Sequence, residues 1–155
     1  MNQKLDEKDL AILALVQRDA KLTAREIAKN INTPITTIFS KIKRMEQLGI
    51  IKGYKAILDS SKLDRGIGAF ILVSVSYGIE GSQIDVATEM ARFPEVQEVQ
   101  IITGDWDILI KLKARDVDSI GKFVIDKLRQ VKGIQKTLTS VIIATSKETT
   151  EISLT

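Results

Sequence analysis

The chain of 155 residues contains neither cysteine nor histidine. Without them it lacks the usual protein ligands of zinc, haem iron and iron–sulfur clusters. It also lacks the Ser-His and Cys-His pairs that activate nucleophiles. An enzyme built from this sequence would have to work with Asp, Glu, Lys or Tyr alone. We therefore expect no catalytic residue, no metal site and no cofactor.

Long apolar segments are also missing. No run approaches the ~20 apolar residues that span a bilayer, and Met1 leads directly into a charged segment, unlike a signal peptide. We expect a cytoplasmic protein with no membrane partner.

The net charge is only +3, but it is unevenly placed. Residues 1–60 hold 11 Lys and Arg against 7 Asp and Glu, whereas residues 61–155 hold 12 against 13. This basic excess is consistent with a phosphate-bearing partner. Alternatively, a solvated charged surface explains it equally well.

The first part of the chain has the pattern of three short helices. Asp6 with Asp9 and Thr23 with Glu26 have the spacing of capping boxes. Asn32 tolerates the left-handed conformation of a helix end. The dipeptide Thr33-Pro34 predicts a third helix, with threonine as N-cap and proline as first helical residue. Residues 22–49 therefore predict a helix-turn-helix, which places side chains in the DNA major groove.

The third helix has two faces. Helical spacing predicts that Ile35, Ile38, Ile42 and Met45 face the other helices. The remaining face is rich in hydroxyls, which can reach base edges, and in cations, which can bind phosphates. Phe39 lies at the boundary, either as a core residue or as a contact for a thymine methyl. The candidate DNA-binding residues are Thr33, Ile35, Thr36, Thr37, Phe39, Ser40, Lys41, Lys43 and Arg44.

Residues 50–58 follow Gly49 and predict an extended wing or linker strand, before a polar hinge at 59–62. Strands are then predicted at 69–77, 96–103, 107–114 and 134–145, with helices at 82–92 and 116–131. The order βαββαβ predicts a ferredoxin-like sandwich, so the whole chain is α+β. We expect domains at 1–58 and 59–155. Both helices would cover one sheet face, and the other apolar face predicts a homodimer.

The connection between the two middle strands is Thr103-Gly104-Asp105-Trp106-Asp107. Turn chemistry alone explains Gly104 and Asp105. The only tryptophan and a second carboxylate are less expected in a plain turn. Asp107 could bind an ammonium group, and a purely structural turn is the alternative.

Together these segments resemble the Lrp/AsnC (feast/famine) family of transcriptional regulators. The resemblance rests on Leu5-Asp6, Glu26-Ile27-Ala28, Lys41-Ile42, Gly53-Tyr54 and Gly104-Asp105-Trp106-Asp107. It implies a winged helix-turn-helix that binds double-stranded DNA, a sheet-to-sheet dimer assembling into tetramers or octamers, and a free amino acid as effector. The effector residues that it implies are Ile101, Gly104, Asp105, Trp106, Asp107, Thr137, Thr139 and Val141.

The sequence departs from that family at two points. The family's usual Gly-Leu-Ser turn is replaced by Ile31-Asn32-Thr33-Pro34, and its usual arginine in the recognition helix is Lys41. An ammonium group is a point charge and cannot form the bidentate fork of a guanidinium. Base-specific contact by Lys41 is therefore in doubt.

Two other functions fit the same layout. One is an oligomeric metabolite sensor that binds DNA weakly. The other is an enzyme resembling the tetrapyrrole decarboxylases, whose layout is similar but whose activity depends on histidines. The absence of histidine argues against the enzyme.

Overall fold

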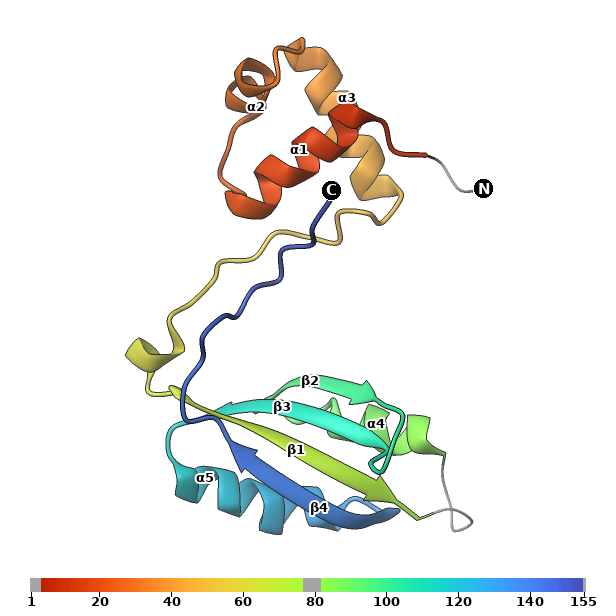
Figure 1. The fold of residues 1–155 in the computed structure, drawn as a ribbon, viewed down its shortest axis with the longest axis vertical. Coiled ribbons are helices and arrows are strands. Elements are labelled where there is room, and N and C mark those ends of the chain that lie inside the picture. The colour runs from red at the N-terminus through yellow and green to blue at the C-terminus, as the bar shows by residue number, and fades with distance from the viewer. Residues whose placement is uncertain (1–3, 77–81, 155) are drawn as a thin grey trace. The chain divides into compact units, whose positions relative to one another are not determined.

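The computed structural model describes residues 4–76 and 82–154. The chain divides into two compact units, one formed by Met1–Ile57 with Lys147–Thr155 and the other by Leu58–Ser146 (Figure 1). The predicted division between residues 58 and 59 stays a prediction. The return of the last residues to the first unit was not expected from the sequence, because local periodicity carries no information on where a tail packs.

The first unit contains α1 (Glu7–Arg18), α2 (Ala24–Asn30) and α3 (Ile35–Gln47). Both predicted capping boxes are confirmed. The Asp9 backbone N–H donates to the Asp6 carboxylate over 2.8 Å, and the Asp6 N–H donates to the Asp9 carboxylate over 2.9 Å. Such reciprocal bonds satisfy N–H groups that have no partner inside the helix.

The turn before α3 differs from the prediction by one residue. Asn32 has the expected positive φ of 46°. Pro34, however, is the N-cap, because its carbonyl accepts the first helical bond, from Ile38. Thr33 caps nothing: its hydroxyl donates to the Ile31 carbonyl over 3.1 Å. Sequence spacing fixes such helix boundaries only to within a residue or two.

The core of the first unit is formed by Ile12, Leu13, Ile27, Ile38 and Met45, with Ile42 packed against it. The predicted inward position of Ile35 is wrong, since 39% of this residue is exposed. Periodicity gives the direction of a side chain but does not show whether a neighbour covers it.

The predicted strand at 50–58 is also absent. Gly49 ends the helix with a φ of 69°, but residues 50–58 have no strand partner in the described part of the chain. The predicted hinge contains a short 3₁₀ turn, Ser60–Leu63. An extended pattern predicts conformation, whereas a strand also needs a neighbour to pair with.

The second unit consists of β1 (Ile67–Val75), α4 (Gln83–Met90), β2 (Val96–Ile101), β3 (Ile108–Ala114), α5 (Val117–Lys122) and β4 (Ile134–Val141). A π turn, Phe123–Lys127, and a 3₁₀ turn, Leu128–Gln130, extend α5. The strand order β2-β3-β1-β4 is antiparallel throughout, which confirms the predicted α+β class and ferredoxin-like layout. The predicted end of the first strand at Tyr77 lies outside the described residues.

The two faces of this sheet differ. Alternate residues of β1 and β3, such as Ile71 and Ile110, form a core with α4 and α5. The intervening residues point to the opposite face, where Phe70 and Leu138 are exposed and Leu72 and Leu109 are half-buried. Within residues 4–76 and 82–154, no helix is long and apolar enough to cross a membrane.

Candidate functional site

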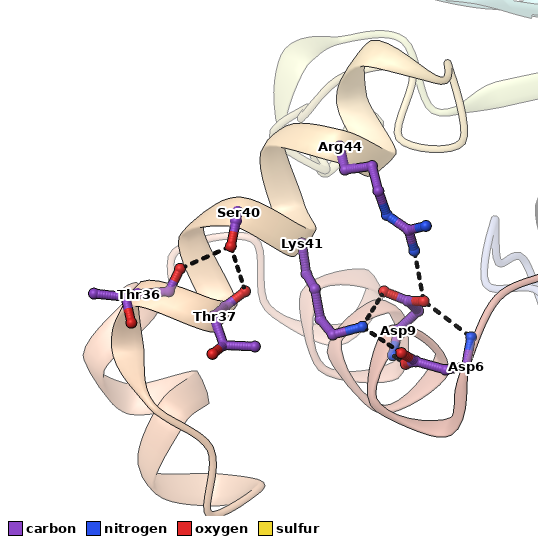
Figure 2. A network of polar contacts seen from close by, with 7 residues as sticks. All are labelled: Asp6, Asp9, Thr36, Thr37, Ser40, Lys41 and Arg44. Atoms are coloured by element: carbon purple, nitrogen blue, oxygen red, sulfur yellow. Dashed lines mark hydrogen bonds and ion pairs between the residues drawn. The ribbon is translucent and has the colours of Figure 1, made fainter.

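The outer face of α3 carries five of the nine candidate DNA-binding residues, and Figure 2 shows three of them, Thr36, Thr37 and Ser40. Thr36, Ser40 and Lys43 are exposed, and Thr37 is half-buried. Phe39 is 62% exposed, so its interpretation as a core residue is wrong. The exposed phenyl ring gives this face an apolar group that could be buried against a partner.

The Ser40 hydroxyl has its proton engaged within the helix. It donates to the Thr36 carbonyl over 2.9 Å and to the Thr37 carbonyl over 3.3 Å. A serine hydroxyl has one proton and two lone pairs, so the oxygen remains able to accept. It therefore suits a donor on a base edge, such as the amino group of adenine or cytosine.

Lys41 and Arg44 lie differently from the other candidates (Figure 2). The Lys41 Nζ lies 2.5 Å from an Asp6 oxygen and 3.0 Å from an Asp9 oxygen, and the lysine side chain is only 16% exposed. Arg44 Nη2 donates to Asp9 over 2.7 Å. Both cations therefore tie α3 to the start of α1.

The electrostatics of this cluster favour the charged forms. The Lys41 ammonium and the Asp9 N–H hold the pKa of Asp6 at about 2. Burial raises the pKa of Asp9, but the hydrogen bonds from Asp6, Lys41 and Arg44 outweigh burial and lower it. The Asp6 hydrogen bond raises the pKa of Lys41, against the opposing effect of burial. The cluster is thus a charged internal contact at neutral pH.

The remaining two candidates in this unit are poorly placed for base contacts. Thr33 is buried, and its hydroxyl donates to the Ile31 carbonyl within the same turn. Ile35 is partly exposed at the first residue of α3. On α2 and α3, the exposed cations are Arg25, Lys29 and Lys43.

In the second unit, Asp107 holds three elements together. One carboxylate oxygen accepts the Val75 N–H over 2.7 Å, and the other accepts the Gln83 side-chain amide over 2.7 Å. The start of β3 is thereby bonded to the end of β1 and the start of α4. Asp107 consequently has a structural role, whatever else it binds. Gly104 in the same loop has a φ of 118°, which favours glycine.

Trp106 and Thr137 line one open hollow, together with Arg129 and Leu138. Trp106 is half-buried there, and Asp105 beside it is exposed. The β2–β3 loop therefore lies close to β4 at this hollow.

The other effector candidates do not converge. Ile101 lies on β2, whereas Thr139 and Val141 lie on β4, and these strands form opposite edges of the sheet. Two strands separate them, so about 14 Å divides the edges at a strand spacing of ~4.8 Å. One chain cannot place all eight residues around one small molecule.

Sequence reasoning missed the partners of these residues. The capping pattern of Asp6 and Asp9 gives no sign that they also bind cations, and no sequence pattern points to Gln83. Sequence spacing gives no sign of a contact between residues 32 or 35 positions apart, such as Lys41 and Arg44 with Asp9. Among the described residues, no group of three or more acidic side chains could hold a metal ion.

Comparison with known protein families gives two matches. A model of the Lrp/AsnC ligand binding domain matches residues 68–152. A model of a winged helix-turn-helix DNA-binding domain matches residues 5–52.

Individual proteins are similar along their whole length. An HTH-type transcriptional regulator of Pyrococcus furiosus is 36% identical over 148 residues, covering 96% of this chain and 99% of the relative. The regulator FL11 of Pyrococcus horikoshii is 34% identical over 99% of both chains. Among solved structures, a Neisseria meningitidis transcriptional regulator in complex with L-Met is 28% identical, with a TM-score of 0.88 and 97% of both chains covered. AsnC of E. coli is 25% identical, with a TM-score of 0.87, covering 96% of this chain and 98% of that one.

Proposed function

Because the chain belongs to the Lrp/AsnC family of transcriptional regulators, we propose that α3 reads the DNA major groove and that a free amino acid, bound by the second unit, modulates DNA binding or assembly. A DNA-binding helix-turn-helix and a ligand-binding domain are both present. We further propose which residues contact DNA and the effector, that the effector is an amino acid, and that the protein acts in the cytoplasm without enzymatic activity.

The exposed face of α3 carries the DNA-binding proposal. Thr36, Thr37, Phe39 and Ser40 contact base edges, and Lys43 contacts phosphate. Lys41 and Arg44, which the sequence suggested as phosphate contacts, act as positioning residues through Asp6 and Asp9. They orient α3 on α1, so their substitution would change the fit of the helix to DNA.

The salt dependence of DNA binding tests this part. A duplex would first be selected by the protein from a random pool, and its affinity measured by fluorescence anisotropy at several salt concentrations. If each of two subunits neutralises about three phosphates, through Lys43, Arg25 and Lys29, the log–log slope is about −5. A slope near zero would contradict the proposal.

The effector site is proposed to lie between subunits. The hollow lined by Trp106 and Thr137 supplies one side of it. The candidates on β2 are too far from those on β4 to complete it within one chain. A second chain would supply the missing side, and the apolar face with Phe70, Leu72, Leu109 and Leu138 supports the homodimer that precedes any tetramer or octamer. The L-Met complex of the Neisseria regulator supports an amino acid as ligand.

Thermal unfolding with each of the twenty free amino acids would identify the effector. A ligand in hundredfold excess over Kd stabilises the folded state by about 2.7 kcal/mol. The stabilisation should be lost in Trp106→Ala and kept in Gln97→Ala, a change of an exposed residue on β2 that does not line this hollow. Asp107→Ala is a poor probe, because it also breaks the bonds to Val75 and Gln83. No selective stabilisation would contradict an amino-acid effector.

One observation favours a second function, a metabolite sensor that binds DNA weakly. Two of the three cations expected on α3 are engaged with Asp6 and Asp9. In that case the selection from the random pool would yield no tightly bound duplex, while one amino acid would still raise the unfolding temperature.

A further inference from the structure

The end of the chain contacts the DNA-binding unit. Gln17 of α1 forms two hydrogen bonds with the backbone of Ile152: its amide donates to the Ile152 carbonyl over 3.2 Å, and its carbonyl accepts the Ile152 N–H over 2.8 Å. These two bonds resemble the pairing of one strand residue with another. They fix the position and the direction of the backbone at this residue.

Leu154 adds an apolar contact two residues later. It packs against the core cluster that contains Ile12 and Leu13. An apolar hollow in the same unit is lined by Leu13, Val16, Tyr54, Ile152 and Leu154. The C-terminal tail, residues 147–154, belongs to the first unit, and its backbone runs towards α1 (Figure 1). Its polar and apolar contacts there are made by Ile152 and Leu154.

The residues that lead to this contact are fixed at their other end too. The Ile142 N–H donates to the Gly68 carbonyl over 2.9 Å, within the second unit. A side chain at Gly68 would meet Ile142 at 2.9 Å, so the approach is close. Residues 143–153 between these contacts are exposed. This exposed segment is therefore a second connection between the two units, held to the first unit by the non-covalent contacts of Ile152 and Leu154.

We propose that residues 147–154 are an intrachain ligand of the DNA-binding unit, and that their docking joins this unit to the effector unit at a second point. With residues 48–59 as the only connection, the paired DNA-binding units of a dimer would sample many orientations. A second connection reduces that freedom and raises the effective concentration of one unit at its half-site once the other is bound. Docking would therefore strengthen binding to paired half-sites without contacting DNA.

Spin labelling tests the docking itself, without DNA. The chain has no cysteine, so Glu151→Cys provides a single labelling site on the exposed part of the tail. The label should broaden the methyl NMR signals of Leu13 and Val16. Broadening should disappear when Gln17→Ala and Leu154→Asp are combined, and persist with Ile143→Asp, since Ile143 is fully exposed. No broadening in the single-label protein would overturn the proposal.

A mixed sample distinguishes docking within a chain from exchange between chains. Spin-labelled chains without isotope label would be mixed with isotope-labelled chains that carry no spin label. Docking within the chain predicts no broadening in the reassembled mixture. Broadening there would show that the tail docks on another chain, and it would overturn the intrachain assignment.

DNA binding tests the consequence, which rests on the proposed function. For Gln17→Ala and for Leu154→Asp, affinity for a selected duplex with two half-sites should fall about tenfold, while affinity for one half-site changes less than twofold. Ile143→Asp should match the unchanged protein on both. Equal losses on both duplexes, or no loss on either, would overturn the coupling. If no duplex is bound at all, the proposed function fails, and the labelling experiment still decides whether the tail docks.

Discussion

At the scale of the residue, Lys41 and Lys43 show how two similar cations on one helix have different roles. The Lys41 ammonium contacts Asp6 and Asp9, and Asp9 is fully buried. Lys43 is exposed two residues later. A buried carboxylate that loses a cationic partner is costly, whereas an exposed lysine contributes little to folding.

Lys41→Ala should therefore destabilise the first unit by about 2 kcal/mol, less than the usual penalty for a broken buried pair because Arg44 still contacts Asp9. Lys43→Ala should leave stability within about 0.5 kcal/mol and weaken DNA binding. Urea denaturation followed by circular dichroism measures the first quantity, and anisotropy measures the second. Equal stability of the two variants would contradict the positioning role.

The same cluster predicts a pH dependence. The pKa of Asp6 is held at about 2 by Lys41 and the Asp9 N–H, below the ordinary value of 3.8. A lowered carboxyl pKa gives stability that is present above the ordinary value and is lost as pH falls through the folded-state value. Lys41 has a raised pKa, so its contribution is complete below the ordinary 10.5 and is lost only as pH rises through the higher folded value.

The urea midpoint of the first unit should accordingly be level through the neutral range and fall between about pH 4 and pH 2. Asp6→Asn removes the group with the lowered pKa and should reduce that fall. The measurement is a series of urea titrations across acid pH. An acid-induced fall as steep in Asp6→Asn as in the unchanged protein would assign it to other carboxyls.

At the scale of the element, α3 presents opposite environments at adjacent positions. Ile38 is fully buried in the core of the first unit, and Phe39 is 62% exposed. Ile38→Ala should cost about 3 kcal/mol, because it leaves a cavity. Phe39→Ala should change stability by less than about 0.5 kcal/mol and still weaken binding to the selected duplex. Denaturation and anisotropy on the same two variants check both statements, and unchanged DNA affinity in Phe39→Ala would remove this residue from the interface.

At the scale of the whole molecule, we propose that the sheet forms the contact between two chains. The helix-free face carries Phe70, Leu72, Leu109 and Leu138, and burial of this apolar face is expected to stabilise a dimer. Phe70→Asp should convert dimers to monomers at micromolar concentration, measured by sedimentation velocity. Ile125→Asp, an equivalent change at an exposed position beyond α5, should keep the dimer. A dimer that persists in Phe70→Asp would place the interface elsewhere.

Features that depend on neighbouring residues can be predicted from the order of the amino acids. Asp6 with Asp9, and Thr23 with Glu26, cap their helices because the bonding groups are three positions apart. The alternation of Ile108, Ile110 and Leu112 buries one side of β3 because successive side chains point to opposite faces. These local rules were enough for the helix-turn-helix and the βαββαβ order.

Contacts between distant groups, in contrast, become known only from the folded chain. Lys41 and Asp9 are far apart in the sequence, as are Gln17 and Ile152, and nothing in the local pattern links them. The strand order also places Ile101 and Thr139 on opposite edges, although both fitted one expected site. Contacts of this kind depend on how whole helices and strands pack. The local sequence is compatible with many possible partners, and packing determines which of them meet.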